Sequence, residues 1–187
     1  MSLRDSDSSF VLQKKFNQST LMSSAFSLLT LELIGCIESL NSQVYVNPFL
    51  QNQDKTSGLI IDPKTTFDRS SLEDPEKNYI HYQTTAFSLS AIDALGYAPE
   101  HSLAFLDYFR DKNNINKYFE NIDWSNPWHE SNKVMFLLQF FSFELIRLKD
   151  ENAKKYIDQI LDLLDKYQDS KTGLWGTQYG ASSFSAM

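Results

Sequence analysis

Apolar residues recur along most of the chain at steps of three to five residues, which is the spacing of one face of an α-helix. The first such stretch runs from about Ser19 to Leu40. Glycine and proline are scarce, six and five residues, and most of them fall between the periodic stretches. The pattern therefore predicts an all-α fold. Further helices are expected over about 41–53, 79–95, 101–110, 113–121, 126–149 and 151–167.

Proline and glycine mark several of the expected helix ends. Gly96 suits the left-handed position that follows a helix. Asn126-Pro127 is a typical start, with Asn126 as the cap and proline at the first helical position. The second helix begins either near Asn41 or at Asn47-Pro48.

The two longest C-terminal stretches differ in how far their apolar residues extend around the helix. Those of 126–149 cover most of the circumference, which predicts an inner helix buried on more than one side. Those of 151–167 lie on one face and leave the charged residues largely on the other, which predicts an outer helix. Inner helices covered by outer ones make a two-layer α/α arrangement.

An internal repeat is the most specific feature of the sequence. Residues 53–60 (Gln-Asp-Lys-Thr-Ser-Gly-Leu-Ile) align without a gap on residues 168–175 (Gln-Asp-Ser-Lys-Thr-Gly-Leu-Trp). Each copy follows an expected helix. We expect the glycine to adopt a positive φ, the polar residues to form the turn and the apolar pair to pack into the next layer.

The spacing of Gln168, Gly173 and Trp175 resembles the core repeat motif of terpenoid cyclases and protein prenyltransferase β subunits, which are α/α toroids. The small residues and Leu-Gly end of 84–96 are also similar to the inner helices of that superfamily. The resemblance implies a toroid over most of 19–180. A closed ring of six helix pairs needs about 250 residues or more, so we expect a partial or incomplete barrel belonging to a larger protein.

The domain prediction that follows is a flexible N-terminal segment over 1–18 and a single α/α helical-repeat domain over 19–187. The aspartate-rich catalytic motifs of terpenoid cyclases and terpene synthases do not occur in the sequence. Cys36 lies in an apolar stretch, where a small buried side chain is its commoner role. Neither terpenoid chemistry nor a zinc site is therefore expected.

Charge and composition narrow the classes of partner. A net charge of -7 disfavours nucleic acids and anionic membrane surfaces. One cysteine cannot form an internal disulfide, and three histidines provide no clustered metal site. The first residues contain no apolar leader, and charged residues interrupt the longest apolar stretch. We therefore expect a cytoplasmic protein without a membrane span, cofactor or metal.

Two helix starts, 79–84 and 123–132, are rich in groups that hydrogen-bond or stack. In a toroid such starts converge at one mouth, where indole rings can face a sugar and carboxylates can act as acid and base. The catalytic candidates are His81, Asp123 and Glu130. The ligand-binding candidates are Tyr82, Trp124, Asn126, Trp128, His129 and Asn132. The alternative is structural, with the indoles packing the helix start and Asn126 capping it.

These observations predict a domain that binds or modifies a glycan or an isoprenoid-linked glycan precursor, with a saccharide or polyprenyl ligand. The alternative is a non-catalytic helical interaction or scaffold domain, which an exposed apolar face would favour. Self-association, or docking to the remainder of a larger protein, fits both hypotheses.

Overall fold

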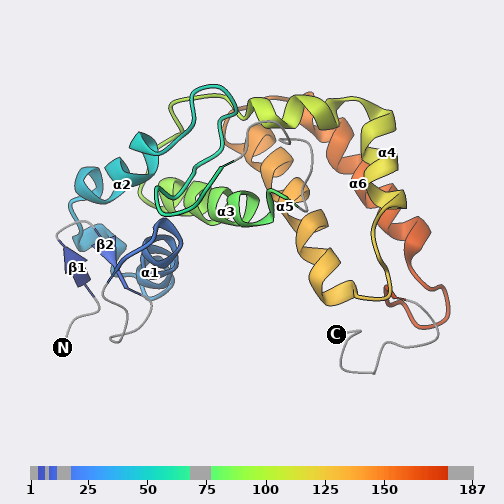
Figure 1. Ribbon diagram of the computed structural model, residues 1–187, viewed down its shortest axis with the longest axis horizontal. Helices are drawn as coiled ribbons and strands as arrows, with labels where there is room; N and C mark the ends of the chain where they lie inside the picture. The colour runs from blue at the N-terminus through green and yellow to red at the C-terminus, as the bar shows by residue number, and fades with distance from the viewer. Residues whose placement is uncertain (1–3, 7–8, 12–17, 68–76, 177–187) are drawn as a thin grey trace. The chain divides into compact units, whose positions relative to one another are not determined.

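A computed structural model of the chain describes residues 4–6, 9–11, 18–67 and 77–176. The chain is all-α, as predicted, apart from a short antiparallel pair of strands, β1 (Arg4–Ser6) and β2 (Ser9–Phe10). Its elements fall into two compact units, Met1–Phe105 and Leu106–Met187, which are described separately below (Figure 1). The flexible segment over 1–18 and the single domain over 19–187 stay predictions.

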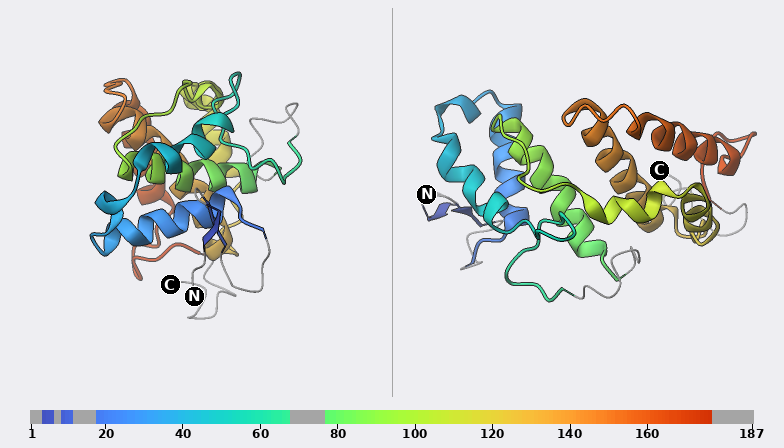
Figure 2. Two further views of the ribbon diagram at one scale, coloured as in Figure 1. Left: turned by 90° about the vertical axis from the view of Figure 1, so that its left-hand side faces the viewer. Right: turned by 90° about the horizontal axis from the view of Figure 1, so that it is seen from above.

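The first unit is built on α1 (Leu21–Leu33), α2 (Ser42–Gln51) and α3 (Tyr79–Ala94), with the 3-10 helix η1 (Ile37–Ser39) between α1 and α2. α1 packs directly on α3, and the two lie side by side in both views of Figure 2. The three helices share a fully buried core. It includes Leu28 of α1, Val46 and Phe49 of α2, and Tyr82, Ala86 and Ile92 of α3.

Gly35 ends α1 earlier than the predicted boundary near Leu40. It has a φ of +69, and its N–H donates to the carbonyl of Glu32 while the N–H of Cys36 donates to that of Leu31. This pair of bonds satisfies two carbonyl groups of the last helical turn and reverses the chain. The helix predicted to continue to Leu40 is therefore replaced by a turn and η1. The same arrangement at Gly96 confirms the predicted end of α3.

Pro48 lies inside α2, so the start predicted at Asn47-Pro48 is wrong. α2 begins at Ser42, and only the hydrogen bond that the missing N–H of Pro48 would have made is lost. The predicted helix over 101–110 is also wrong in part. Residues 101–103 are not helical, and the 3-10 helix η3 (Ala104–Arg110) follows them.

The second unit contains α4 (Lys112–Glu120), α5 (Pro127–Ile146) and α6 (Ala153–Tyr167). α5 and α6 pack together as a hairpin, and α4 lies against α6. Pro127 opens α5 as predicted, but the side chain of Asn126 makes no capping hydrogen bond. α5 buries Phe136, Leu137, Phe140 and Phe141 completely. α6 buries Ala153, Tyr156 and Ile160 on one face, which confirms its predicted amphipathic character.

Candidate functional site

The first copy of the repeated motif forms a compact turn after α2. The N–H of Asp54 donates to the carbonyl of Leu59, and that of Gly58 donates back to the carbonyl of Asp54. The carboxylate of Asp54 accepts from both the N–H and the hydroxyl of Ser57, each at 2.8 Å. Gly58 has a φ of +80, as the sequence predicted. The turn therefore holds its shape with bonds among its own residues.

A segment of the first unit, residues 101–105, which bends and then enters η3, docks on this turn through its main chain. The side-chain amide of Gln53 accepts from the N–H of His101 at 2.9 Å and donates to its carbonyl at 2.8 Å. The N–H of Phe105 donates to the carbonyl of Ser57 at 2.9 Å. A Cβ on Gly58 would lie 2.0 Å from the carbonyl oxygen of Ser102, so only glycine permits this approach.

The second copy, residues 168–175, repeats these internal hydrogen bonds. The N–H of Asp169 donates to the carbonyl of Leu174, and that of Gly173 donates to the carbonyl of Asp169. The Asp169 carboxylate accepts from the N–H and the hydroxyl of Thr172. Gln168 Nε2 donates to the carbonyl of Gly173 at 2.8 Å, as Gln53 Nε2 does to that of Gly58 at 3.0 Å. The repeat detected in the sequence is thus a repeat of structure.

The two turns differ in what covers them. Ser57 and Gly58 are buried in the first turn, whereas the corresponding Thr172 and Gly173 are exposed. No described residue lies within 4 Å of a Cβ built on Gly173. Leu174 is 44% exposed, whereas the corresponding Leu59 is completely buried. Within the described part of the chain, only the first turn has a segment docked on it.

His81 and Tyr82 are buried in the first unit. His81 Nε2 lies 2.9 Å from the carbonyl of Thr66, and since a carbonyl only accepts, this nitrogen carries the proton. Burial lowers the pKa of His81 below its ordinary value, partly offset by this hydrogen bond, so the ring is neutral at pH 7. Its Nδ1 is buried without a hydrogen-bond partner. Tyr82 is completely buried and packs on Phe105.

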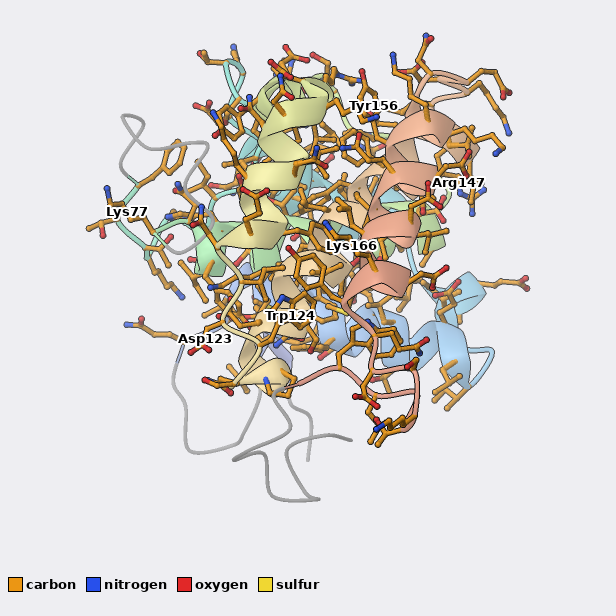
Figure 3. All side chains as sticks on the ribbon, turned by 90° about the vertical axis from the view of Figure 1, so that its right-hand side faces the viewer. Lys77, Asp123, Trp124, Arg147, Tyr156 and Lys166 are labelled. Atoms are coloured by element: carbon orange, nitrogen blue, oxygen red, sulfur yellow. The ribbon has the colours of Figure 1, made fainter. Side chains whose placement is uncertain are left out.

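Three candidates of the second unit, Asp123, Trp124 and Asn126, lie together in the segment between α4 and α5. Trp124 is half-buried and stacks on Tyr167 of α6, with ring centroids 5.2 Å apart. Figure 3 shows Trp124 beside the last part of α6 and Asp123 on the outside. Asp123 and Asn126 are exposed. Hydrogen bonds from the hydroxyl and then the N–H of Ser125 hold the pKa of Asp123 below its ordinary value.

Glu130 is buried and forms an ion pair with Lys133 at 2.7 Å, one turn along α5. Asn132 is half-buried on the same helix. The backbone of Trp128 and His129 belongs to α5, but their side chains lie outside the described residues. The structure thus brings the candidates of 123–132 into one stretch of the second unit, and His81 and Tyr82 belong to the first.

A groove of about 650 Å³ lies along α4 and α6, and no sequence pattern pointed to it. It is lined on one side by Lys112 and Asn116 and on the other by residues of α6 such as Tyr156 and Gln159. Gln159 Nε2 donates across it to the carbonyl of Lys112 and to Asn116 Oδ1. Periodicity cannot reveal such a groove because its walls come from helices more than thirty residues apart.

Arg110 links this groove to a buried carboxylate. Its guanidinium lies 2.8 Å from Glu144 and 3.0 Å from Asp107. Burial raises the pKa of Glu144 to about 7, although the charge of Arg110 opposes the rise. The second oxygen of Glu144 is buried without a hydrogen-bond partner. This carboxyl group therefore has a strongly raised pKa, and it lies outside the predicted site.

The described residues contain no group of three or more histidine, cysteine, aspartate or glutamate side chains placed to hold a metal ion. Over the same part of the chain, no helix has the length and apolar character needed to cross a bilayer. No protein-family model matches the chain, and neither a curated protein nor a solved structure matches it. The resemblance to the toroid superfamily accordingly stays a prediction that depends on the two turns.

Proposed function

We propose that the chain is a non-catalytic helical interaction domain that binds another polypeptide. The observation that carries the proposal is the first Gln-Asp turn, which holds residues 101–105 through three hydrogen bonds to the main chain of that segment. The segment contributes only main-chain groups to these bonds, so the same device can hold segments of other sequences. Its second copy repeats the geometry on an exposed surface.

The states of the catalytic candidates also favour a structural role. His81 is 3% exposed, and one ring nitrogen is committed to Thr66. Glu130 is 6% exposed and paired with Lys133. A general acid or base must reach its substrate within hydrogen-bond distance, which these buried positions do not offer. The proposal therefore assigns both side chains to stability.

The end of α1 provides a second feature typical of an interaction domain. Leu33 is 86% exposed and Ile34 61% exposed. They adjoin Cys36, which is exposed and not buried as the sequence predicted, because the chain turns at Gly35. Single exposed apolar residues are ordinary on protein surfaces, but neighbouring ones of this size favour contact with another molecule. An exposed apolar face is the feature that would favour an interaction domain, and these two residues support the proposal in that sense.

A direct comparison of ligand classes tests the proposal. The full chain, labelled at its N-terminus, is applied to an array of immobilised decapeptides and, in parallel, to arrays of glycans and polyprenyl phosphates. We expect saturable binding to a subset of peptides, unchanged in an Asn126→Ala control. Binding confined to glycans or polyprenyl phosphates would overturn the proposal.

The second candidate function is binding of a glycan, which one observation favours. Trp124 is half-buried and supported by Tyr167, with the exposed Asp123 and Asn126 in the same segment. An aromatic ring next to carboxylate and amide groups is a common arrangement for a sugar. Saccharide binding that is lost in both Trp124→Ala and Asn126→Ala would support this candidate, and binding that survives both would contradict it.

A further inference from the structure

We infer that the second turn, residues 168–175, binds a short segment of another polypeptide, through its main chain, in the way that the first turn binds residues 101–105. This inference rests on the proposed function and names the chemistry of the partner. The two copies share their internal hydrogen bonds, but the first has its segment docked and the second is exposed.

The amide of Gln168 is already oriented for such a segment. In the first turn, the Nε2 of Gln53 donates to Gly58 within the turn, which turns the Oε1 toward the N–H of His101. Gln168 makes the same internal bond to Gly173 at 2.8 Å. Its Oε1 can therefore accept a main-chain N–H, and its Nε2 can donate a second bond to the carbonyl of the same residue.

Two further contact points of the first turn also have counterparts. The carbonyl of Ser57, which accepts from Phe105, corresponds to that of Thr172, and Thr172 is exposed. Gly58, which allows the backbone of Ser102 to approach, corresponds to Gly173, where no described residue lies within 4 Å of a built Cβ. The second turn thus offers the full set of groups that hold the segment in the first.

The docked segment defines which partner would fit. His101, the clamped residue, provides both an N–H and a carbonyl to the amide of Gln53. Phe105, four positions later, provides another N–H to the carbonyl of Ser57. Proline is therefore excluded at both positions. Leu103 and Phe105, two and four positions after the clamped residue, are 1% and 3% exposed. The expected partner is a short segment that can adopt the same bent conformation, with apolar residues at those two positions, which can also cover Leu174.

A peptide copied from the docked segment provides the probe. Residues 98–107 of this chain, Ala-Pro-Glu-His-Ser-Leu-Ala-Phe-Leu-Asp, carry a fluorophore and are titrated with the full-length protein in a fluorescence anisotropy assay. We expect saturable binding, and we expect chemical-shift changes at the amides of Thr172 and Gly173 when the titration is followed by NMR.

Two changes separate the assigned contacts from nonspecific binding. Gln168→Ala removes two hydrogen bonds, each contributing about a factor of five, so we expect affinity to fall tenfold or more. Lys171→Ala is the matched control, because its side chain takes no part in the docking, and we expect wild-type affinity. N-methylation of the peptide's histidine removes the clamped N–H without altering the protein, and we expect about a fivefold loss.

Three results would overturn the assignment: no binding up to millimolar peptide, equal affinity for wild type and Gln168→Ala, or no effect of N-methylation. If peptides of the array bind without depending on Gln168, the interaction function stands and this site is rejected. If no peptide binds at all, both fail.

Discussion

Replacing Gly58 and Gly173 by alanine, one at a time, compares the same change at equivalent positions of the two turns. Both glycines have a positive φ, +80 and +70, so each substitution places alanine in the left-handed region. That conformation costs about 1 kcal/mol relative to glycine at each site. Any difference between the variants must therefore come from what surrounds the turn.

The surroundings predict a large difference. At Gly58 the new Cβ would lie 2.0 Å from the Ser102 carbonyl oxygen and 2.9 Å from the Leu103 Cα, and these main-chain atoms cannot rotate away. The docked segment must move and lose its three hydrogen bonds to the turn, about 1 kcal/mol each. We expect Gly58→Ala to lower the free energy of unfolding by about 4 kcal/mol, and Gly173→Ala to lower it by about 1 kcal/mol.

Urea unfolding followed by far-UV circular dichroism measures both variants. Tryptophan fluorescence in the same samples reports on the second unit, because Trp124, Trp128 and Trp175 all belong to it. Both signals are compared with the wild type, and similar slopes of the unfolding transition show that the unfolded states match.

Equal destabilisation of the two variants, within about 0.5 kcal/mol, would refute the reasoning. It would mean either that the segment 101–105 does not lie on the first turn or that the second turn is covered as closely as the first.

The remaining predictions concern the core and the buried charges. Phe141→Ala should lower the free energy of unfolding by about 4 kcal/mol, because the ring is completely buried and stacked on Tyr156. Leu161→Ala should lower it by less than about 1 kcal/mol, because Leu161 is 46% exposed. The midpoints of urea unfolding check both values. Lys133→Met should cost about 3 kcal/mol by leaving Glu130 buried without this partner, and adding Glu130→Leu should restore at least half of that stability in the same assay. The raised pKa of Glu144, about 7 in the folded state against 4.5 in the unfolded chain, means that the native protein binds this proton more tightly. Its contribution to stability is therefore present below pH 4.5 and lost as the pH rises through 7, so wild type should lose stability relative to Glu144→Gln between pH 5 and 8; parallel curves would contradict this.

The helical segments were predictable because each buries one face of regular spacing. The amphipathic character of α6 is an example, and the end of α3 at Gly96 followed from a local preference of glycine. The errors arose where a local signal competed with periodicity. Gly35 stops α1 although apolar residues continue to Leu40, and Pro48 is accommodated inside α2 at the loss of one hydrogen bond.

The two Gln-Asp turns were predictable as turns, but not their different surroundings. Their sequences encode the same internal bonds, because every donor and acceptor involved lies within eight residues. What covers the first turn comes from His101, forty-eight residues from Gln53. Likewise, the partner of His81 is a carbonyl in a loop, at Thr66, which no spacing rule identifies.

The closed set of bonds inside each turn has a consequence for how such a protein can evolve. A turn that needs no outside contact to keep its shape can be duplicated with its helix and remain folded before anything has evolved to cover it. The exposed second turn keeps the same internal bonds as the first, although no described segment is docked on it. Substitutions on the surface of such a turn can then be selected for binding to another segment without disturbing the turn itself.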